Sequence, residues 1–178
     1  MSETLARKSG IPHTVVSPGS HKSPASTGSL AVNAAFLKEI KDDNRQLKGL
    51  WDKLVPMFSH HQTAKNHWTE LVAGLSELRD QLAIHFSLEE AYGYFDEAVD
   101  IAPHLSLVAE SLRSDHSKLF AEIRDLADRI AECKVDRVEH IEKVIFQFNQ
   151  FRKQFQRHEE AELKLILESF DDDIGVGD

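Results

Sequence analysis

Two copies of a His-x-x-x-Glu pattern are the features of this sequence best suited to chemistry. His85 is followed by Glu89 and His158 by Glu162, and a third histidine, His116, lies between the two pairs. Residues four apart in an α-helix share one face, one turn apart. Each pair therefore offers an imidazole beside a carboxylate. Nitrogen and oxygen ligands without thiolate suit iron, manganese or zinc.

Four long amphipathic helices are predicted to position these residues. Apolar side chains recur at alternating steps of three and four along four stretches: 37–58, 68–92, 105–130 and 138–165. Breaks are predicted near 59–66, 98–103 and 133–136. We expect an all-α fold, an antiparallel up-down-up-down four-helix bundle with short connections.

Polar residues interrupt the apolar stripe of every predicted helix. They are Asn44, His85 with Glu89, His116, and His158 with Glu162. Positions on neighbouring antiparallel helices are level when their sequence midpoint falls in the connection, as it does here for each successive pair. We therefore expect all six residues in one interior layer. Two buried carboxylates without compensation cost several kcal/mol each or become protonated, which favours a bound cation.

An internal repeat supports a single site. A polar residue is followed about 41 residues later by His-x-x-x-Glu in both halves of the chain, first from Asn44 and then from His116. The repeat predicts an approximate twofold axis through the site, with Asn44 in the position equivalent to His116. Gln81 and Gln154 each lie four residues before a repeat histidine.

Several polar residues near the ligands have alternative roles. We favour a supporting role for Asn44 over direct ligation. Gln81 and Gln154 either hydrogen-bond a ligand or bound water, or lie on the surface. Tyr92 either donates a hydrogen bond to a bound oxygen ligand or packs in the core, and packing is favoured. Three further acids are expected to be solvated: Glu90, Glu159 and Glu160.

The chain resembles the haemerythrin-like (HHE cation-binding) domain family over roughly residues 35–170. Four segments carry the resemblance: Asp-Asn-Arg-Gln-Leu-Lys (43–48), His-Phe-Ser-Leu-Glu-Glu (85–90), Leu-Arg-Ser-Asp-His (112–116) and Arg-His-Glu-Glu-Ala-Glu (157–162). The resemblance implies a four-helix bundle around two non-haem iron ions. It also implies that Glu89 and Glu162 bridge the ions and that His85, His116 and His158 are terminal ligands. A single ion, or manganese or zinc, is the alternative.

Two departures from the family pattern bear on function. Asn44 stands where the family has its first-helix histidine, and Leu112 and Phe120 stand where oxygen carriers have a second histidine on the third helix. Fewer imidazoles leave coordination positions open. The resemblance therefore implies binding or sensing of oxygen, nitric oxide or iron rather than bulk oxygen carriage.

Two other functions compete with this interpretation. The first is a helical interaction module with a structural or absent metal, in which buried His–Glu and Asn contacts fix the helix register. The second is a di-metal oxidase or peroxidase acting on peroxide or another small substrate. We favour a protein that is not an enzyme. The sequence shows no effector domain, so a sensor would need a partner protein, and the oligomeric state is open.

Composition excludes several classes of partner and site. The formal charge of −9 over 178 residues argues against nucleic acid and anionic membranes as partners, because both are polyanions. The single cysteine, Cys133, excludes an intrachain disulfide framework and a thiolate-rich zinc site. No apolar run reaches membrane-spanning or signal-peptide length, so we expect a cytoplasmic protein.

The ends of the chain differ from its middle. Residues 1–30 hold three of the five prolines and seven serines without an apolar pattern, and are expected to be a disordered tail. Residues 31–170 are expected to form the haemerythrin-like bundle. Residues 171–178 begin with three aspartates and are expected to be a frayed acidic tail.

Overall fold

A computed structural model describes residues 27–134 and 137–175, with side chains over 38–134 and 137–171, and this part of the chain is helical without a strand. The elements are α1 (Thr27–Met57), α2 (His61–Asn66), α3 (Trp68–Ala91), α4 (Asp96–Ile101), the 3-10 helix η1 (Pro103–Leu105), α5 (Ser106–Glu132) and α6 (Val138–Gly175). The all-α prediction is confirmed for the described residues. The tail predicted for residues 1–30 lies outside the described residues as far as residue 26, but residues 27–30 belong to α1, so that part of the prediction is wrong.

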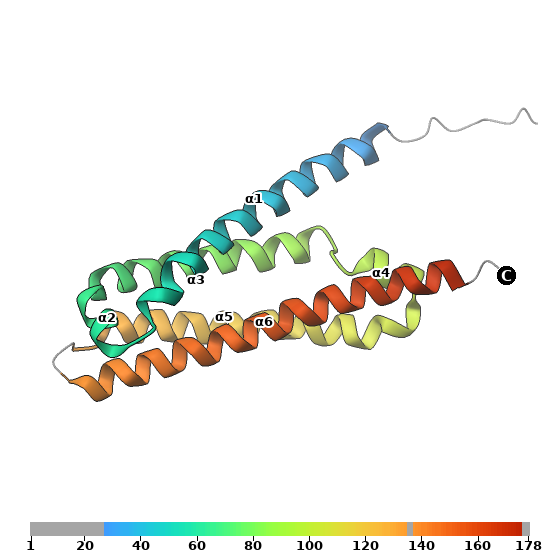
Figure 1. Cartoon of the computed structure of the whole chain (residues 1–178). Helices are drawn as coiled ribbons and strands as arrows, with labels where there is room; N and C mark the ends of the chain where they lie inside the picture. Colours follow the sequence, from blue (N-terminus) through green and yellow to red (C-terminus); the bar gives the residue numbers. More distant parts are fainter. Residues whose placement is uncertain (1–26, 135–136, 176–178) are drawn as a thin grey trace, which may run out of the picture.

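The four long helices pack in chain order. Helix α1 packs on α3, α3 on α5, and α5 on α6. Aromatic rings also join α1 and the residue that follows it to α6. The rings of Trp51 and Phe155 have centroids 5.7 Å apart, and Phe58, just after α1, stacks on Phe148 with centroids 4.0 Å apart. Figure 1 shows α1, α3, α5 and α6 lying lengthwise beside one another, with α1 diverging from α6 toward its N-terminal end.

Two helix ends differ from the prediction. Helix α6 continues to Gly175, so residues 171–175 are helical rather than frayed. The buried Ser169 extends its packed face one turn past Leu165. The second predicted stretch, 68–92, corresponds to α3, which ends at Ala91, and the short α4 then overlaps the break predicted near 98–103.

Gly93 explains the early end of α3. Its φ of +60° lies in the left-handed region that glycine favours. The Tyr94 N–H donates to the Glu89 carbonyl at 3.0 Å, and the Gly93 N–H donates to the Glu90 carbonyl. These two bonds form a Schellman C-cap, which turns the chain away from the helix axis.

The core consists of two apolar clusters with a polar layer between them. Along α5, Leu119 belongs to the larger cluster and Leu112 to the smaller, and His116 lies between. Along α6, Phe155 belongs to the larger cluster and Leu165 to the smaller. Apolar packing on both sides limits the access of water to the polar layer, which strengthens electrostatic interactions inside it. Within the described residues, no helix has both the length and the apolar character to cross a bilayer.

Candidate metal centre

Three helices bring the five predicted ligands together in the polar layer. Helix α3 supplies His85 and Glu89, α5 supplies His116, and α6 supplies His158 and Glu162. All five are buried, with 2–6% of each residue exposed. Burial of two carboxylates among three imidazoles fits the interior site predicted from the stripes.

The first group of candidate ligands contains Glu89, His116, His158 and Glu162, whose ligand atoms lie within 4.8 Å of one another. Oε1 of Glu162 lies 2.9 Å from Nε2 of His158 and 3.4 Å from Nε2 of His116. Oε2 of Glu89 lies 3.4 Å from the same His116 nitrogen. Ligand atoms about 2.0–2.2 Å from one ion lie about 3–4.4 Å apart, so this spacing suits a common ion.

The second group contains His85, Glu89 and Glu159. Nε2 of His85 lies 3.3 Å from Oε1 of Glu89 and 3.0 Å from Oε1 of Glu159. Glu89 therefore belongs to both groups, with one oxygen toward His85 and the other toward His116. Glu162 belongs to the first group alone, and its bridging role stays a prediction from the resemblance.

Asp43 of α1 contacts the His85 ring at Nδ1, the nitrogen that does not face Glu89 and Glu159. Its Oδ2 lies 2.7 Å from Nδ1 of His85, and its Oδ1 accepts a 2.6 Å hydrogen bond from Nε2 of Gln81. A carboxylate at Nδ1 keeps a proton on that nitrogen, which leaves Nε2, directed at Glu89 and Glu159, as the ring atom that could bind a metal ion. This is the arrangement that orients metal-bound histidines.

Buried atoms without hydrogen-bond partners test whether these residues fit a metal ion. Oε2 of Glu89 and both ring nitrogens of His158 are buried and lack such a partner. Nε2 of His158 is close to Glu162, but the direction of the contact does not make a hydrogen bond. Unpartnered buried polar atoms are costly. Since Glu89 Oε2 and His158 Nε2 both belong to the first group, the residues fit a cation at its centre.

The pKa values of the two buried glutamates shift in opposite directions in the metal-free protein. Burial raises the pKa of Glu89 from 4.5 to about 8, with His85 opposing the shift and Glu162 adding to it. Burial also acts to raise the pKa of Glu162, but the neighbouring His116 and His158 outweigh it and lower that pKa. Glu89 therefore retains a proton in the position where a metal ion would supply positive charge.

Two of the imidazoles hold their protons strongly in the same environment. Burial alone would lower the pKa of His85, but hydrogen bonds to Asp43 and Glu159 and the electrostatic influence of Glu89 raise it from 6.5 to about 10. Burial likewise opposes protonation of His116, and its bonds to Glu162 and Glu90 outweigh burial and raise its pKa. Protonated His85 and His116 thus place positive charge beside the buried acidic groups when no metal is bound.

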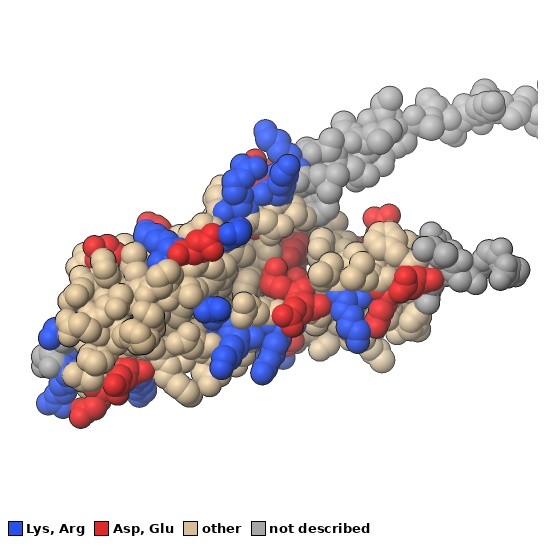
Figure 2. Space-filling model, in the orientation of Figure 1, with Lys and Arg blue, Asp and Glu red and all other residues tan. Residues whose placement is uncertain are grey.

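A cavity of about 330 Å³ opens onto the second group. Its wall includes His85, Glu89 and Glu159, and its less polar parts are Ile40 of α1, Leu88, Tyr94 and Leu163. Figure 2 shows acidic side chains gathered in the middle of the displayed face, between α1 and α6. The cavity is large enough for water and a small molecule beside the candidate ligands.

Asn44 does not lie in the interior, so that prediction is wrong. Asn44 is exposed at the rim of the cavity, and its neighbour Asp43 is the buried residue, 5% exposed. The steps from Ile40 to Leu47 satisfy helical spacing through residue 43 or through residue 44. The contact between Asp43 and His85, which sequence spacing does not encode, decides between them.

The other supporting residues divide between site and surface. Gln81 reaches the site through Asp43, whereas Gln154 is exposed. Tyr92 follows the last residue of α3 and is 40% exposed, so it does not pack in the core. Its hydroxyl donates a 2.8 Å hydrogen bond to Glu39. The partly buried Tyr94 takes a place on the cavity wall instead.

Two acids expected to be solvated contact the imidazoles. Glu159 keeps 38% of its side chain exposed and lies against His85, so the prediction of a fully solvated Glu159 is wrong. Glu90 is 57% exposed but has an oxygen 3.2 Å from Nδ1 of His116. Glu160 is exposed as predicted, although it borders the cavity. Sequence reasoning missed Asp43, Glu159 and Tyr94. For Tyr94 the sequence did hold a signal, because Gly93 indicates a turn that ends α3 just before it.

Comparison of the chain with protein-family models gave no match, and comparisons with curated proteins and with solved structures gave none either. The candidate centre therefore stands on the geometry and chemistry of the chain's own residues.

Proposed function

We propose that the protein is a haemerythrin-like non-haem di-iron protein that binds or senses oxygen, nitric oxide or iron rather than carrying oxygen in bulk. Its fold is then an antiparallel up-down-up-down bundle of α1, α3, α5 and α6. The buried cluster carries the proposal, because two carboxylates and three imidazoles from three helices converge there. Such a cluster is compensated best by a metal cation.

The ligand types and the cavity support the choice of ion and of bound molecule. Nitrogen and oxygen donors without thiolate suit iron, manganese or zinc, and iron is the ion that the resemblance implies. A bound iron ion would be a redox-active Lewis acid to which small molecules could bind. The 330 Å³ cavity beside His85 and Glu89 gives such molecules room. The apolar clusters on either side of the layer protect it from bulk water.

Metal analysis of protein purified anaerobically without added metal tests the proposal. We expect about two iron equivalents per chain in the unchanged protein and a large loss in His158→Ala. His140→Ala is the matched control, because His140 is exposed on the same helix. Less than about half an equivalent of any transition metal would contradict metal binding. Zinc or manganese in place of iron would contradict the di-iron assignment alone.

An interaction module is a second candidate, favoured by an apolar stripe on α6. Leu163, Leu167 and Phe170 recur at helical spacing and are each more than half exposed, at 58%, 55% and 51%. This function predicts an intact fold and unchanged association when the three site histidines are replaced together. Circular dichroism and sedimentation measure both properties.

A di-metal oxidase or peroxidase is a third candidate, favoured by the cavity beside Glu89 and Tyr94. It predicts turnover of hydrogen peroxide by the iron-loaded protein and its loss in Glu89→Ala. Absence of turnover in the loaded, unchanged protein contradicts this function.

A further inference from the structure

We propose that Glu159 is a ligand of the second metal position of the centre, which makes the two positions inequivalent. This inference rests on the proposed metal-binding function and adds a ligand that the sequence pattern did not predict. The second position is the group of His85, Glu89 and Glu159, whose ligand atoms lie within 4.8 Å of one another. Oε1 of Glu159 lies 3.0 Å from Nε2 of His85, on the side of the ring opposite Asp43.

The shared carboxylate of Glu89 is independent evidence for two positions. Glu89 is 6% exposed, and its Oε2, which points to the first group, has no hydrogen-bond partner. Its Oε1 points to His85 in the second group. A buried carboxylate with oxygens directed at two separate sets of ligands is placed to contact one cation on each side.

His85 differs from His158 in the contact made by its Nδ1 nitrogen. Its Nδ1 is held by the buried Asp43, so its Nε2 is directed at Glu89 and Glu159. His158, the counterpart of His85 in the repeat, has no hydrogen-bond partner at Nδ1. The two halves of the centre therefore share the His-x-x-x-Glu pattern but differ in how the imidazole is supported.

The two positions differ in number and type of ligand. The first has two imidazoles and two carboxylates, all buried. The second has one imidazole and two carboxylates, of which Glu159 is partly exposed at the cavity. Fewer ligands and access to water weaken binding and speed exchange. A ligand set rich in oxygen also suits a hard divalent ion such as Mn²⁺ better than a soft one.

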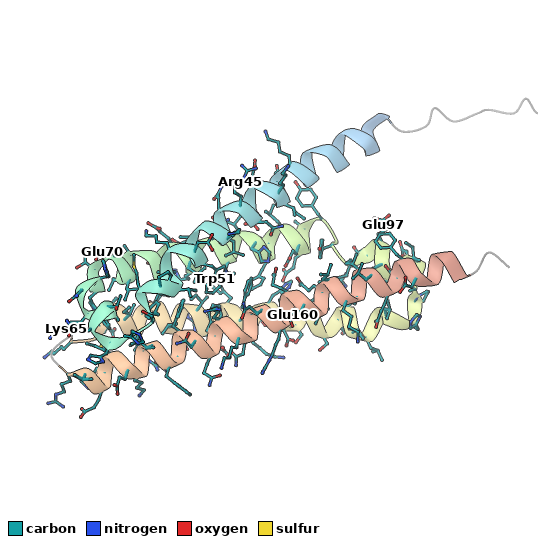
Figure 3. All side chains as sticks on the ribbon, viewed as in Figure 1. Arg45, Trp51, Lys65, Glu70, Glu97 and Glu160 are labelled. Carbon is teal, nitrogen blue, oxygen red and sulfur yellow. The ribbon has the colours of Figure 1, made fainter. Side chains whose placement is uncertain are left out.

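Titration with Mn²⁺ tests this assignment on the full chain after removal of metal with a chelator. Free Mn²⁺ is counted by electron paramagnetic resonance. The unchanged protein should bind two equivalents with different affinities. Glu159→Gln should keep the tighter equivalent and weaken the other by about tenfold or more. Glu168→Gln is the matched control and should bind like the unchanged protein, since Glu168 is exposed on α6 and does not line the cavity, unlike Glu160, which is labelled in Figure 3.

The outcomes separate this inference from the proposed function. Two equivalents with unchanged affinity in Glu159→Gln would overturn the role of Glu159 and leave metal binding intact. A single equivalent in the unchanged protein would overturn the second position. No binding at all would overturn the proposed function as well. Glutamine preserves the size of a partly exposed side chain, and circular dichroism checks that the fold is unchanged.

Discussion

Oδ2 of Asp43 lies 2.7 Å from Nδ1 of His85, which joins α1 to α3 inside the layer of candidate ligands. Both residues are 5% exposed. Helix α1 thus contributes a carboxylate that contacts a candidate ligand, and it contributes no candidate ligand among its described side chains.

Asp43→Asn should weaken binding of the ion beside His85 by about 10–100-fold while preserving the fold, because it removes the charge that orients and polarises the imidazole. Mn²⁺ titration measures the loss. Asn44→Ala is the control, because Asn44 is exposed on the next residue of α1. Equal affinities in Asp43→Asn and the unchanged protein would contradict the role of this pair.

His158→Ala should remove most of the stabilisation that metal gives to the fold. A ligand that binds only the folded state stabilises it by roughly 2.7 kcal/mol at a free concentration a hundred times its Kd. Thermal unfolding with added Fe²⁺ and with EDTA measures this difference anaerobically. The gain in Tm should be large in the unchanged protein and in His140→Ala, and small in His158→Ala. A full gain in His158→Ala would show that this imidazole is not a ligand.

The metal-free protein should lose stability as pH rises from about 5 to 9. The pKa of Glu89 is raised from 4.5 to about 8 in the folded state, so its contribution is complete below 4.5 and is lost as pH rises through 8. The pKa of His85 is raised from 6.5 to about 10, so its contribution is lost at higher pH in the same direction. The lowered pKa of Glu162 acts in the opposite direction only at acidic pH, near and below 4.5.

Urea unfolding in EDTA at about pH 6 and pH 9 measures this trend. Glu89→Gln should show a shallower dependence, because its side chain does not titrate. Metal competes with protons for the same atoms, so the gap between loaded and metal-free protein should widen toward pH 9. Greater stability of the metal-free protein at pH 9 than at pH 6 would contradict the buried, protonated centre.

Gly93→Ala should destabilise the fold by roughly 1–2 kcal/mol, because the residue adopts a left-handed φ of +60°. A Cβ there would also lie 2.1 Å from Oδ2 of Asp96, so the Asp96 side chain would have to move away. Gly49→Ala is the opposite control, since a Cβ at Gly49 in α1 meets nothing within 4 Å and alanine favours a helix by about 1 kcal/mol. Urea unfolding should give opposite signs for the two variants, and equal signs would contradict the strain at Gly93.

Helical periodicity was sufficient to predict the four long helices and the burial of the five candidate ligands, but not the short α2 and α4, which fall at predicted breaks. The stripes of α3, α5 and α6 place His85, His116 and His158 at one level because steps of three and four fix the inward face of a long helix. The same rule cannot choose between Asp43 and Asn44, since both satisfy it. The choice depends on a hydrogen bond to a residue about 40 positions away.

Residues beside a stripe are the hardest to predict from sequence. Glu159 follows His158 by one position, about 100° around the helix, and periodicity therefore assigns it to solvent. Glu159 nevertheless belongs to the candidate site, because it contacts His85 on another helix. Tyr94 depends on the Schellman turn at Gly93, a local signal that the longer apolar pattern obscures.

The attachment of α1 through Asp43 decides how a metal ion would affect this helix. Of the four long helices, α1 lacks a candidate metal ligand among its described side chains, and its polar link to His85 is the Asp43 carboxylate. The pKa of His85 is raised to about 10, so its Nε2 carries a proton in the metal-free protein. An ion at Nε2 would replace that proton and leave the contact at Nδ1 in place. Helix α1 is thus held to the ring by the same contact whether or not Nε2 binds an ion.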